Sequence, residues 1–245
     1  MNLYDFIWKR KSTRKYDMTP LGEEQMERIE QFAKDMKPLY PGIETAYEIT
    51  SDVKGLKPLK APRYLIIYSE AKDGYLENAG FMFQQMDLFL SSEGLGSCWF
   101  GAAKTPAESK PGMKYVITLA FGKAEGSPYR ELSEFKRKPL SEISSGSDER
   151  IEAARLAPSA VNFQNWFFAA YHTHSGENAA HGKIDVYRKK TILSAERHLG
   201  DMSKIDMGIA LCHLYLATEH AGREFILTKE ADKSKSGYVY VGTVS

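Results

Sequence analysis

Two long stretches of this chain, residues 77–93 and 203–221, are apolar almost all round, and each predicts a helix. A helix with so little polar surface belongs at the centre of a domain. Each is followed by a predicted strand that ends in glycine, in the sequences LAFG and VYVG. The fold therefore has to be built around two central helices, and this requirement constrains the architecture more than any other feature of the sequence.

The glycine register links the two helices. When Gly80 is aligned with Gly208, Gly94 falls on Gly222 without a gap. Glycine just after a helix is a candidate for the left-handed residue that ends it. The register favours an internal duplication, and the alternative is that two buried helices of equal length look alike by chance. Two such halves would pack about a pseudo-twofold axis, long helix against long helix, as a homodimer written in one chain.

The remaining elements follow from apolar periodicity and turn residues, and the order helix, strand, long helix, strand occurs twice. The predicted elements are helices at 21–36 and after Ser147 as its N-cap, strands at 63–69, 114–121, 166–171, 183–188 and 238–244, and loops at 41–60 and 176–182.

A polar stretch, residues 126–149, separates the two sets of elements. Runs of Ser, Gly, Pro and charged residues mark loops and boundaries. The predicted organisation is an N-terminal half at 1–125, a linker at 126–146 and a C-terminal half at 147–245, within one integrated domain.

Composition excludes several classes of protein. The 245 residues are 42% hydrophobic and 27% charged, which is typical of a globular protein. The formal charge of +1 gives no overall field that would attract nucleic acid or acidic lipid. Two cysteines, Cys98 and Cys212, allow no disulfide framework and suit a reducing compartment. The absence of an 18-residue apolar run argues against a membrane span. The expectation at this point is a cytoplasmic protein of mixed helices and strands.

Donors for an anion gather near the N-terminus, in the run RKSTR at 10–14. Arginine's planar fork suits phosphate oxygens, and a serine adds a short hydrogen bond. The same run could be a solvated basic terminus. A second basic run, KRKP at 136–139, could add cations to a phosphate or could be a charged linker.

Two further segments could contact a ligand. In the loop 157–166 (APSAVNFQNW), small and amide-bearing residues could meet the polar edge of a planar heterocycle, or could bond only their own backbone. The run 94–101 (GLGSCWFG) is extended and small after its first glycine. It could direct backbone N–H groups at a ligand, or be an ordinary connection from helix to strand. It is neither a phosphate-binding P-loop nor a GxGxxG fingerprint.

Other kinds of site find little support. His172 and His174 have a spacing that allows a metal ion, but no Cys or carboxylate at suitable spacing completes a ligand set. No GxSxG nucleophile elbow occurs, and Cys98 has no base close to it in the sequence. We therefore expect no metal and no nucleophilic catalytic side chain.

Taken together, the four segments resemble the nitroreductase family of flavoproteins. Members open with Arg-Arg-Ser-x-Arg-x-aromatic, which 10–16 (RKSTRKY) matches, and carry Ala-Pro-Ser-x-x-Asn-x-Gln-Pro-Trp, which 157–166 matches except at Asn165. A helix ending in Gly-Leu-Gly is matched at 94–96, and an Arg-x-Pro-Leu segment at 137–140. The resemblance covers most of the chain and implies an α+β, nitroreductase-like fold.

The order of the motifs departs from that family. There the Asn-Gln loop precedes the Gly-Leu-Gly helix, whereas here it lies in the second half of the chain. In the family each FMN lies at a dimer interface and takes motifs from both protomers. This chain carries one complete set divided between its halves, so it resembles the fused pseudo-dimer subfamily, similar to the TM nitroreductases, with one flavin site per chain.

The resemblance implies cofactor contacts but no catalytic side chain, because flavin N5 carries the chemistry. The basic segments would hold the FMN phosphate, the run after the Gly-Leu-Gly helix would pass the N5–O4 edge, and the second-half loop would line the isoalloxazine. The implied FMN-binding residues are Arg10, Lys11, Ser12, Arg14, Cys98, Trp99, Phe100, Gly101, Arg137, Lys138, Pro158, Ser159, Asn162 and Gln164.

The implied activity is transfer of hydride from NADH or NADPH through FMN to an electron-poor acceptor such as a nitroaromatic or a quinone. The partners would be these small molecules, with neither nucleic acid nor membrane, and one chain acting as a monomeric pseudo-dimer would suffice. The alternatives are a noncatalytic flavin- or nucleotide-binding module with a degenerate site, and a structural protein with an empty pocket.

Overall fold

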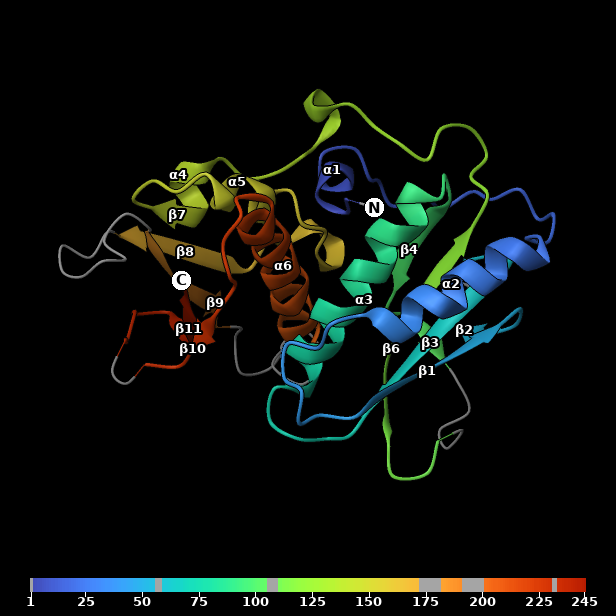
Figure 1. Ribbon diagram of the computed structural model, residues 1–245, viewed down its shortest axis with the longest axis horizontal. Coiled ribbons are helices and arrows are strands. Elements are labelled where there is room, and N and C mark those ends of the chain that lie inside the picture. The colour runs from blue at the N-terminus through green and yellow to red at the C-terminus, as the bar shows by residue number, and fades with distance from the viewer. Residues whose placement is uncertain (1, 56–58, 105–109, 172–181, 191–200, 231–232) are drawn as a thin grey trace. The chain divides into compact units, whose positions relative to one another are not determined.

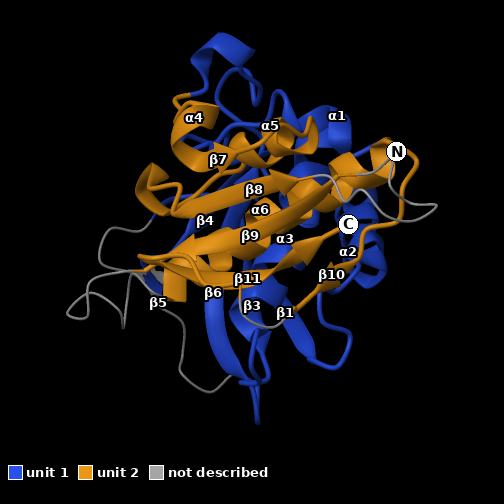
Figure 2. Ribbon diagram, turned by 90° about the vertical axis from the view of Figure 1, so that its left-hand side faces the viewer, with its two compact units in different colours: residues 1–135 blue, residues 136–245 orange. Residues whose placement is uncertain are grey.

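The chain folds into two compact units, residues 1–135 and 136–245, which Figure 2 shows in different colours. The computed structural model describes all residues except 1, 56–58, 105–109, 172–181, 191–200 and 231–232. The division falls after Phe135, inside the polar stretch that was expected to be a linker. The arrangement of the halves as a pseudo-dimer stays a prediction.

Unit 1 is an antiparallel sheet with helices against it (Figure 1). The strand order is β1 (Thr45–Thr50), β3 (Arg63–Ser69), β6 (Lys114–Gly122) and β4 (Gly96–Phe100), so β4 is an edge strand. The long helix α3 (Tyr75–Ser92) packs on this sheet, and α2 (Glu23–Asp35) packs on α3. The short elements are α1 (Tyr4–Ile7), β2 (Lys54–Gly55), β5 (Ala103–Lys104) and the 3-10 turn η1 (Leu132–Glu134).

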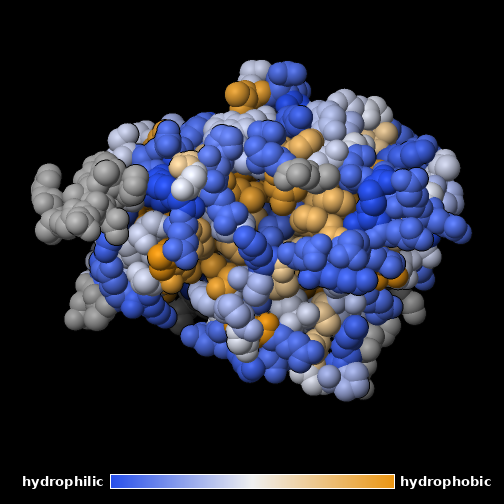
Figure 3. Space-filling model, in the orientation of Figure 1, coloured by the Kyte–Doolittle hydropathy of each residue, from blue (hydrophilic) through white to orange (hydrophobic). Residues whose placement is uncertain are grey.

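The core of unit 1 follows from the apolar runs. Strand β3 is buried along nearly its whole length, with Leu65 and Ile67 fully inaccessible. A second apolar cluster, which includes Tyr64, Phe100 and Ala120, is also buried. Helix α2 is amphipathic instead, because Ile29 and Ala33 are buried while the side that faces the viewer in Figure 3 is hydrophilic.

Unit 2 is built on a five-stranded sheet. Its strand order is β10 (Leu227–Thr228), β11 (Tyr238–Val244), β9 (Lys183–Lys189), β8 (Trp166–Tyr171) and β7 (Ser144–Ser145), antiparallel except for the β7–β8 pair. The long helix α6 (Asp201–His220) contacts β9 and the short helix α5 (Arg150–Arg155). The other elements are α4 (Leu140–Ile143) and the 3-10 turn η2 (Ala160–Asn162).

The two long helices end in the same way. Gly94 has φ +75° and Gly222 has φ +71°, a left-handed conformation that glycine adopts without steric cost. The N–H of the residue after each glycine donates to a carbonyl five residues back, that of Leu90 at 2.9 Å and that of Thr218 at 3.1 Å. These are the hydrogen bonds of a Schellman ending. The glycine register of the sequence therefore corresponds to the same backbone geometry in both units.

Most predicted elements are confirmed and the fold is α+β. The strands at 63–69 and 166–171 have the predicted bounds, and both long helices are present. Two expectations were wrong. Ser147 does not cap α5, whose N-cap position is Glu149. The predicted loop 41–60 contains β1 and β2. The run after Gly94, expected to be extended, forms strand β4. The predicted loop 176–182 lies almost wholly outside the described residues.

Candidate functional site

The basic segment 10–14 lies along the free edge of β4 in unit 1. Ser12 forms a parallel bridge with Ser97, and the Thr13 N–H donates to the Ser97 carbonyl at 2.8 Å. Gly96 permits this approach, because a Cβ there would overlap the Thr13 side chain. Two of the four predicted motifs therefore meet within one unit, on one edge of one sheet.

Arg10 is held from inside the unit. Its Nε lies 3.0 Å from the Asp87 carboxylate, and both side chains are buried. The Nε–H is not aligned with any acceptor, so this contact is an ion pair rather than a linear hydrogen bond. Asp87 also accepts hydrogen bonds from Ser97 and Gln84, and Arg10 Nη2 donates to Ser12 Oγ at 3.3 Å. Arg10 therefore fixes the segment and the position of Ser12.

The other cations of the segment are uncommitted. Among the residues that the structure describes, neither the Lys11 ammonium nor the exposed Arg14 guanidinium has a hydrogen-bond or ion-pair partner. Both flank Ser12, whose hydroxyl is fixed by Arg10. Two cations and a hydroxyl on one short segment are suitable donors for an anion.

Arg130 is a further cation near this segment, and it lies outside all four motifs identified in the sequence. Its Nε donates to the Arg10 carbonyl at 3.0 Å, and its guanidinium carbon lies 3.7 Å from the Phe135 ring centroid. Burial and the nearby Arg10 lower the pKa of Arg130 to about 10, while Glu134 and Asp87 act in the opposite direction. The contact joins residues 120 apart, so no local pattern could have revealed it.

Some N–H and C=O groups of strand β4 face its free edge, on the side opposite β6. Because the Ser97 carbonyl faces the basic segment, and peptide groups alternate between the two edges of a strand, the Trp99 backbone also faces the free edge. The Trp99 side chain donates from Nε1 to Gln84 at 3.2 Å. Cys98 and Phe100 are buried and Gly101 lies in the turn that follows. Burial raises the pKa of the Cys98 thiol, against the effect of Arg14 and Arg10.

The loop 157–166 of unit 2 has an unusual backbone. Val161, Asn162 and Gln164 have φ values of +43°, +62° and +51°. A left-handed conformation is costly for a β-branched residue such as valine, and strain of this kind tends to occur at functional sites. Val161 and Phe163 are exposed apolar side chains, whereas Gln164 is buried.

The structure joins this loop to the second basic run. Arg137 Nη1 donates to Asn162 Oδ1 at 2.8 Å, and Asn162 Nδ2 donates to the Lys136 carbonyl at 2.8 Å. The Lys138 backbone N–H donates to Gln164 Oε1 at 2.8 Å, and Lys138 Nζ donates to the Phe163 carbonyl at 2.8 Å. The other two predicted motifs therefore meet within unit 2, and their amide side chains hold the basic run in place.

The start of the loop is bound by a buried carboxylate. Pro158 is buried, Ser159 Oγ accepts the Gln164 N–H at 3.0 Å, and the Ala160 N–H lies 2.9 Å from Asp206 Oδ1. Burial raises the pKa of Asp206 to about 7, and the Ala160 hydrogen bond opposes this. Asp206 lies outside all four motifs identified in the sequence.

In unit 1 a side chain of the long helix also binds a loop N–H, but this side chain is neutral. Asn78 Oδ1 accepts the Tyr40 N–H at 2.8 Å, and Asn78 aligns with Asp206 in the glycine register. In both units a proline lies two residues before the bound N–H: Pro38 precedes Tyr40, and Pro158 precedes Ala160. The two halves therefore share a loop anchor, but only unit 2 anchors its loop with a carboxylate.

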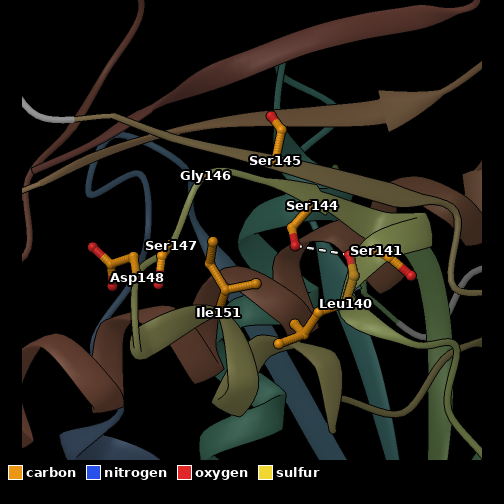
Figure 4. Close-up of a pocket in the computed structure, with 8 residues that line it drawn as sticks. All are labelled: Leu140, Ser141, Ser144, Ser145, Gly146, Ser147, Asp148 and Ile151. Carbon is orange, nitrogen blue, oxygen red and sulfur yellow. Dashed lines mark hydrogen bonds between the residues drawn. The ribbon is translucent and has the colours of Figure 1, made fainter.

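A cavity of about 250 Å³ opens in unit 2 around α4, β7 and the start of α5 (Figure 4). Ser144 Oγ donates to the Leu140 carbonyl at 2.8 Å, and Asp148 is ion-paired with Arg150 at 2.8 Å. None of the predicted flavin-binding residues lines this cavity, whose walls are Leu140, Ser141, Ser144, Ser145, Gly146, Ser147, Asp148 and Ile151.

The described part of the chain offers neither a metal site nor a membrane-spanning helix. It contains no group of three His, Cys, Asp or Glu residues that could hold a metal ion, and His172 and His174 lie outside it. None of its helices has the length and apolar character needed to cross a membrane.

Comparison with known proteins gives a family and a fold. The sequence model of the family described as "Putative TM nitroreductase" matches residues 2–218. The structure is similar to that of a "putative nitroreductase" from Thermotoga maritima, with a TM-score of 0.66, 23% identity, and coverage of 100% of this chain and 93% of that chain. This likeness shows the fold.

Two weaker structural matches cover part of the chain. A nitroreductase family protein from Clostridium difficile 630 has a TM-score of 0.48 and 19% identity, over 60% of this chain and 99% of that chain. A protein described as an FMN-dependent nitroreductase from Clostridium difficile R20291 has a TM-score of 0.45 and 16% identity, over 58% of this chain and 98% of that chain. No curated protein matches the sequence.

Proposed function

The chain belongs to the family described as "Putative TM nitroreductase", and from this membership and the geometry of its basic segment we propose that it is an FMN-dependent oxidoreductase. The donor would be NADH or NADPH and the acceptor an electron-poor molecule such as a nitroaromatic or a quinone. A cytoplasmic location and a single chain acting as a monomeric pseudo-dimer are part of the same proposal.

One observation carries the proposal: segment 10–14 and the outward-facing backbone of Trp99 share the free edge of β4. The residues present suit a phosphorylated flavin. Lys11 and Arg14 have no partner among the described residues, and Ser12 is positioned by the buried Arg10. We assign the phosphate and ribityl contacts to Ser12, Arg14 and Lys11, with Arg10 behind them.

The chemistry that FMN supplies when bound is acceptance of hydride at N5 from NADH or NADPH and delivery of electrons to the acceptor. The Trp99 N–H would donate a hydrogen bond at the N5–O4 edge, where a fixed backbone donor needs no rearrangement. Lys11 or Arg14 would stabilise negative charge near N1. The chain needs no side-chain base for this chemistry, since it supplies binding, orientation and electrostatics.

The contribution of unit 2 is proposed from the family resemblance. Arg137 and Lys138 would add cations for the phosphate, and the loop that begins at Pro158 and Ser159 would line the isoalloxazine. The amide oxygen and the amide nitrogen of Asn162 and of Gln164 each have one partner in the structure. Each of these atoms can form two hydrogen bonds, so both side chains keep capacity for a ligand. Their present partners belong to the basic run and to the loop itself.

Those occupied amides also favour a second candidate, a flavin-binding module that does not turn over. Gln164 is 3% exposed, so it can offer little to a ligand without rearrangement of the loop. Such a module would bind FMN tightly but would not be reduced by a nicotinamide.

An absorbance experiment separates the candidates. The purified chain is loaded with FMN, passed through a desalting column, and mixed anaerobically with NADH or NADPH. Retained yellow colour that is lost on mixing supports the oxidoreductase, and recovery of the colour on adding a quinone or nitroaromatic completes the test. Retained colour that persists supports the noncatalytic module, and failure to retain FMN excludes both.

A further inference from the structure

The buried side of the basic segment holds more positive than negative charge. Arg10 is 1% exposed and pairs with Asp87, which is fully buried. Arg130 lies partly buried beside Arg10, and the same carboxylate acts on both guanidinium groups. Glu134 also faces Arg130, but it is exposed and its Oε2 accepts the Glu131 N–H at 2.7 Å. Two buried or half-buried cations therefore share one buried anion.

Arg130 is fixed at three points. Its backbone N–H donates to the Lys9 carbonyl at 2.9 Å, its Nε donates to the Arg10 carbonyl at 3.0 Å, and its guanidinium lies over the Phe135 ring. Its two terminal nitrogens have no acceptor among the residues that the structure describes. The result is a preorganised pair of donors that lacks an acceptor.

Such an arrangement is unfavourable without an anion. A partly buried charge loses hydration and needs a counter-ion to offset this cost. The guanidinium is cationic at neutral pH and presents two parallel N–H groups, a geometry that matches two oxygens of a phosphate. The antiparallel bridge between Arg10 and Tyr129 places Arg130 opposite Lys9, at the start of the basic segment, and its Nε reaches the Arg10 carbonyl.

We propose that Arg130 is a phosphate-binding residue, and that the counter-ion missing from the Arg10–Asp87–Arg130 cluster is a phosphomonoester. This inference rests on the proposed function when the phosphomonoester is that of FMN. It adds a residue that lies outside every motif identified in the sequence. It also adds a third donor in unit 1, Arg130, to the phosphate contacts proposed for Ser12 and Arg14.

A purely structural role for Arg130 makes a different prediction. If its side chain only supports the Arg10 backbone and covers Phe135, its loss would loosen the segment for every flavin alike. A direct contact with phosphate would affect FMN and leave riboflavin unaffected, because riboflavin has the same ring and ribityl chain without the phosphate. The ratio of the two affinities therefore reports on the contact and not on the fraction of folded protein.

The test compares Arg130→Gln and Arg130→Lys with the wild type, by quenching of flavin fluorescence with FMN and with riboflavin. Arg63→Gln is the matched control, because Arg63 is a partly exposed arginine of the same unit whose guanidinium donates, within the described part of the chain, only to the Pro62 carbonyl. Loss of a charge-assisted contact should weaken FMN binding by about 10- to 100-fold in Arg130→Gln. Riboflavin binding should stay unchanged, Arg130→Lys should be intermediate, and the control should match the wild type.

Equal losses for FMN and riboflavin, or no loss for either, would overturn the inference while leaving the proposed function in place. Titration with inorganic phosphate, followed by phosphorus NMR line broadening, covers the opposite case. If the wild type binds no flavin but binds phosphate in a way that Arg130→Gln abolishes, the proposed function fails and the anion site stands. Absence of both flavin and phosphate binding would exclude the two together.

Discussion

The two units are built alike in backbone and differ in where they place buried charge. Both end their long helix with a left-handed glycine, and both anchor a proline-containing loop on a side chain of that helix. In unit 1 the anchor is the neutral Asn78, and the helix carries its carboxylate at Asp87, paired with Arg10. In unit 2 the anchor is Asp206, which pairs with no cation among the described residues.

This difference separates the features that the two units share from those that they do not. The register that aligns Gly80 with Gly208 puts Tyr215 at the place of Asp87. Both units need helix endings and apolar positions of this kind, whereas a buried ionisable group needs either an opposite charge, as Asp87 has, or a shifted pKa, as Asp206 has. The Arg10–Asp87 pair lies in unit 1 and the strained loop lies in unit 2, while unit 2 also has a buried pair of its own, Arg150 with Asp148.

The largest expected effect tests the buried pair of unit 1. Asp87→Asn leaves Arg10 buried beside a neutral amide, and should lower the free energy of unfolding by about 3–5 kcal/mol. Glu24→Gln is the control, because Glu24 forms an exposed pair with Arg28 and should cost no more than about 0.5 kcal/mol. The measurement is urea unfolding of both variants. Equal and small effects would contradict the account of Arg10 as a buried, fixed side chain.

A second variant exchanges the loop anchors. The folded chain keeps the proton of Asp206 up to about pH 7, whereas an unfolded aspartate releases it near 3.8, so the native state loses stability as pH rises through this window. Asp206→Asn keeps an oxygen acceptor for the Ala160 N–H, as Asn78 does for Tyr40. It should match the wild type below pH 4 and be more stable by at most about 4 kcal/mol above pH 7.

Urea unfolding between pH 4 and pH 8 measures this difference. Asn78→Asp supplies the mirror experiment in unit 1, where introduction of a buried carboxylate should lower stability as pH rises. A stability gain in Asp206→Asn that does not vary with pH would show that the carboxylate is not the group responsible.

The third prediction concerns flavin binding. Arg14→Ala removes an uncommitted cation of unit 1 and should weaken FMN binding by about 1.5–3 kcal/mol, or one to two orders of magnitude. Arg223→Ala is the counterpart in unit 2, where Arg223 follows the aligned glycine but no matching basic motif is present. FMN affinity should be unaffected there. Fluorescence titration decides the matter, and an unchanged affinity in Arg14→Ala would remove the phosphate assignment.

The smallest effect tests the similarity of the units. Gly94 and Gly222 both have left-handed φ, and a Cβ at either position would meet no atom within 4 Å. Alanine at each should therefore cost only the backbone strain of about 1–2 kcal/mol. Thermal unfolding should give equal losses for the two variants, and clearly unequal losses would show that the shared helix ending is superficial.

Local sequence signals predicted the parts of the fold that depend on local chemistry. Strands at 63–69 and 166–171 are continuous apolar runs between polar segments, and their bounds were predicted correctly. Strand β1 was missed because its six residues, TAYEIT, are largely half-buried and include no continuous apolar run. Strand β4 was missed because its first residues are small and follow a helix ending directly.

Long-range contacts explain what the sequence could not reveal about the site. The four motifs were identified from their residue types, and the structure joins them in two pairs, one in each unit. Arg130 and Asp206 acquire their roles from partners that are 120 and 46 residues away, so neither belongs to a recognisable pattern. The prediction that Ser12 and Asn162 contribute to one cleft stays a prediction.

The number of flavins bound per chain tests the central claim most directly, because the claim is that two similar halves provide one site between them. The protein is saturated with FMN, freed of excess, and its flavin absorbance is compared with its concentration from amino-acid analysis. We predict one FMN for each chain of 245 residues. Two per chain would mean that both halves bind independently, and none would mean that the shared scaffold serves another purpose.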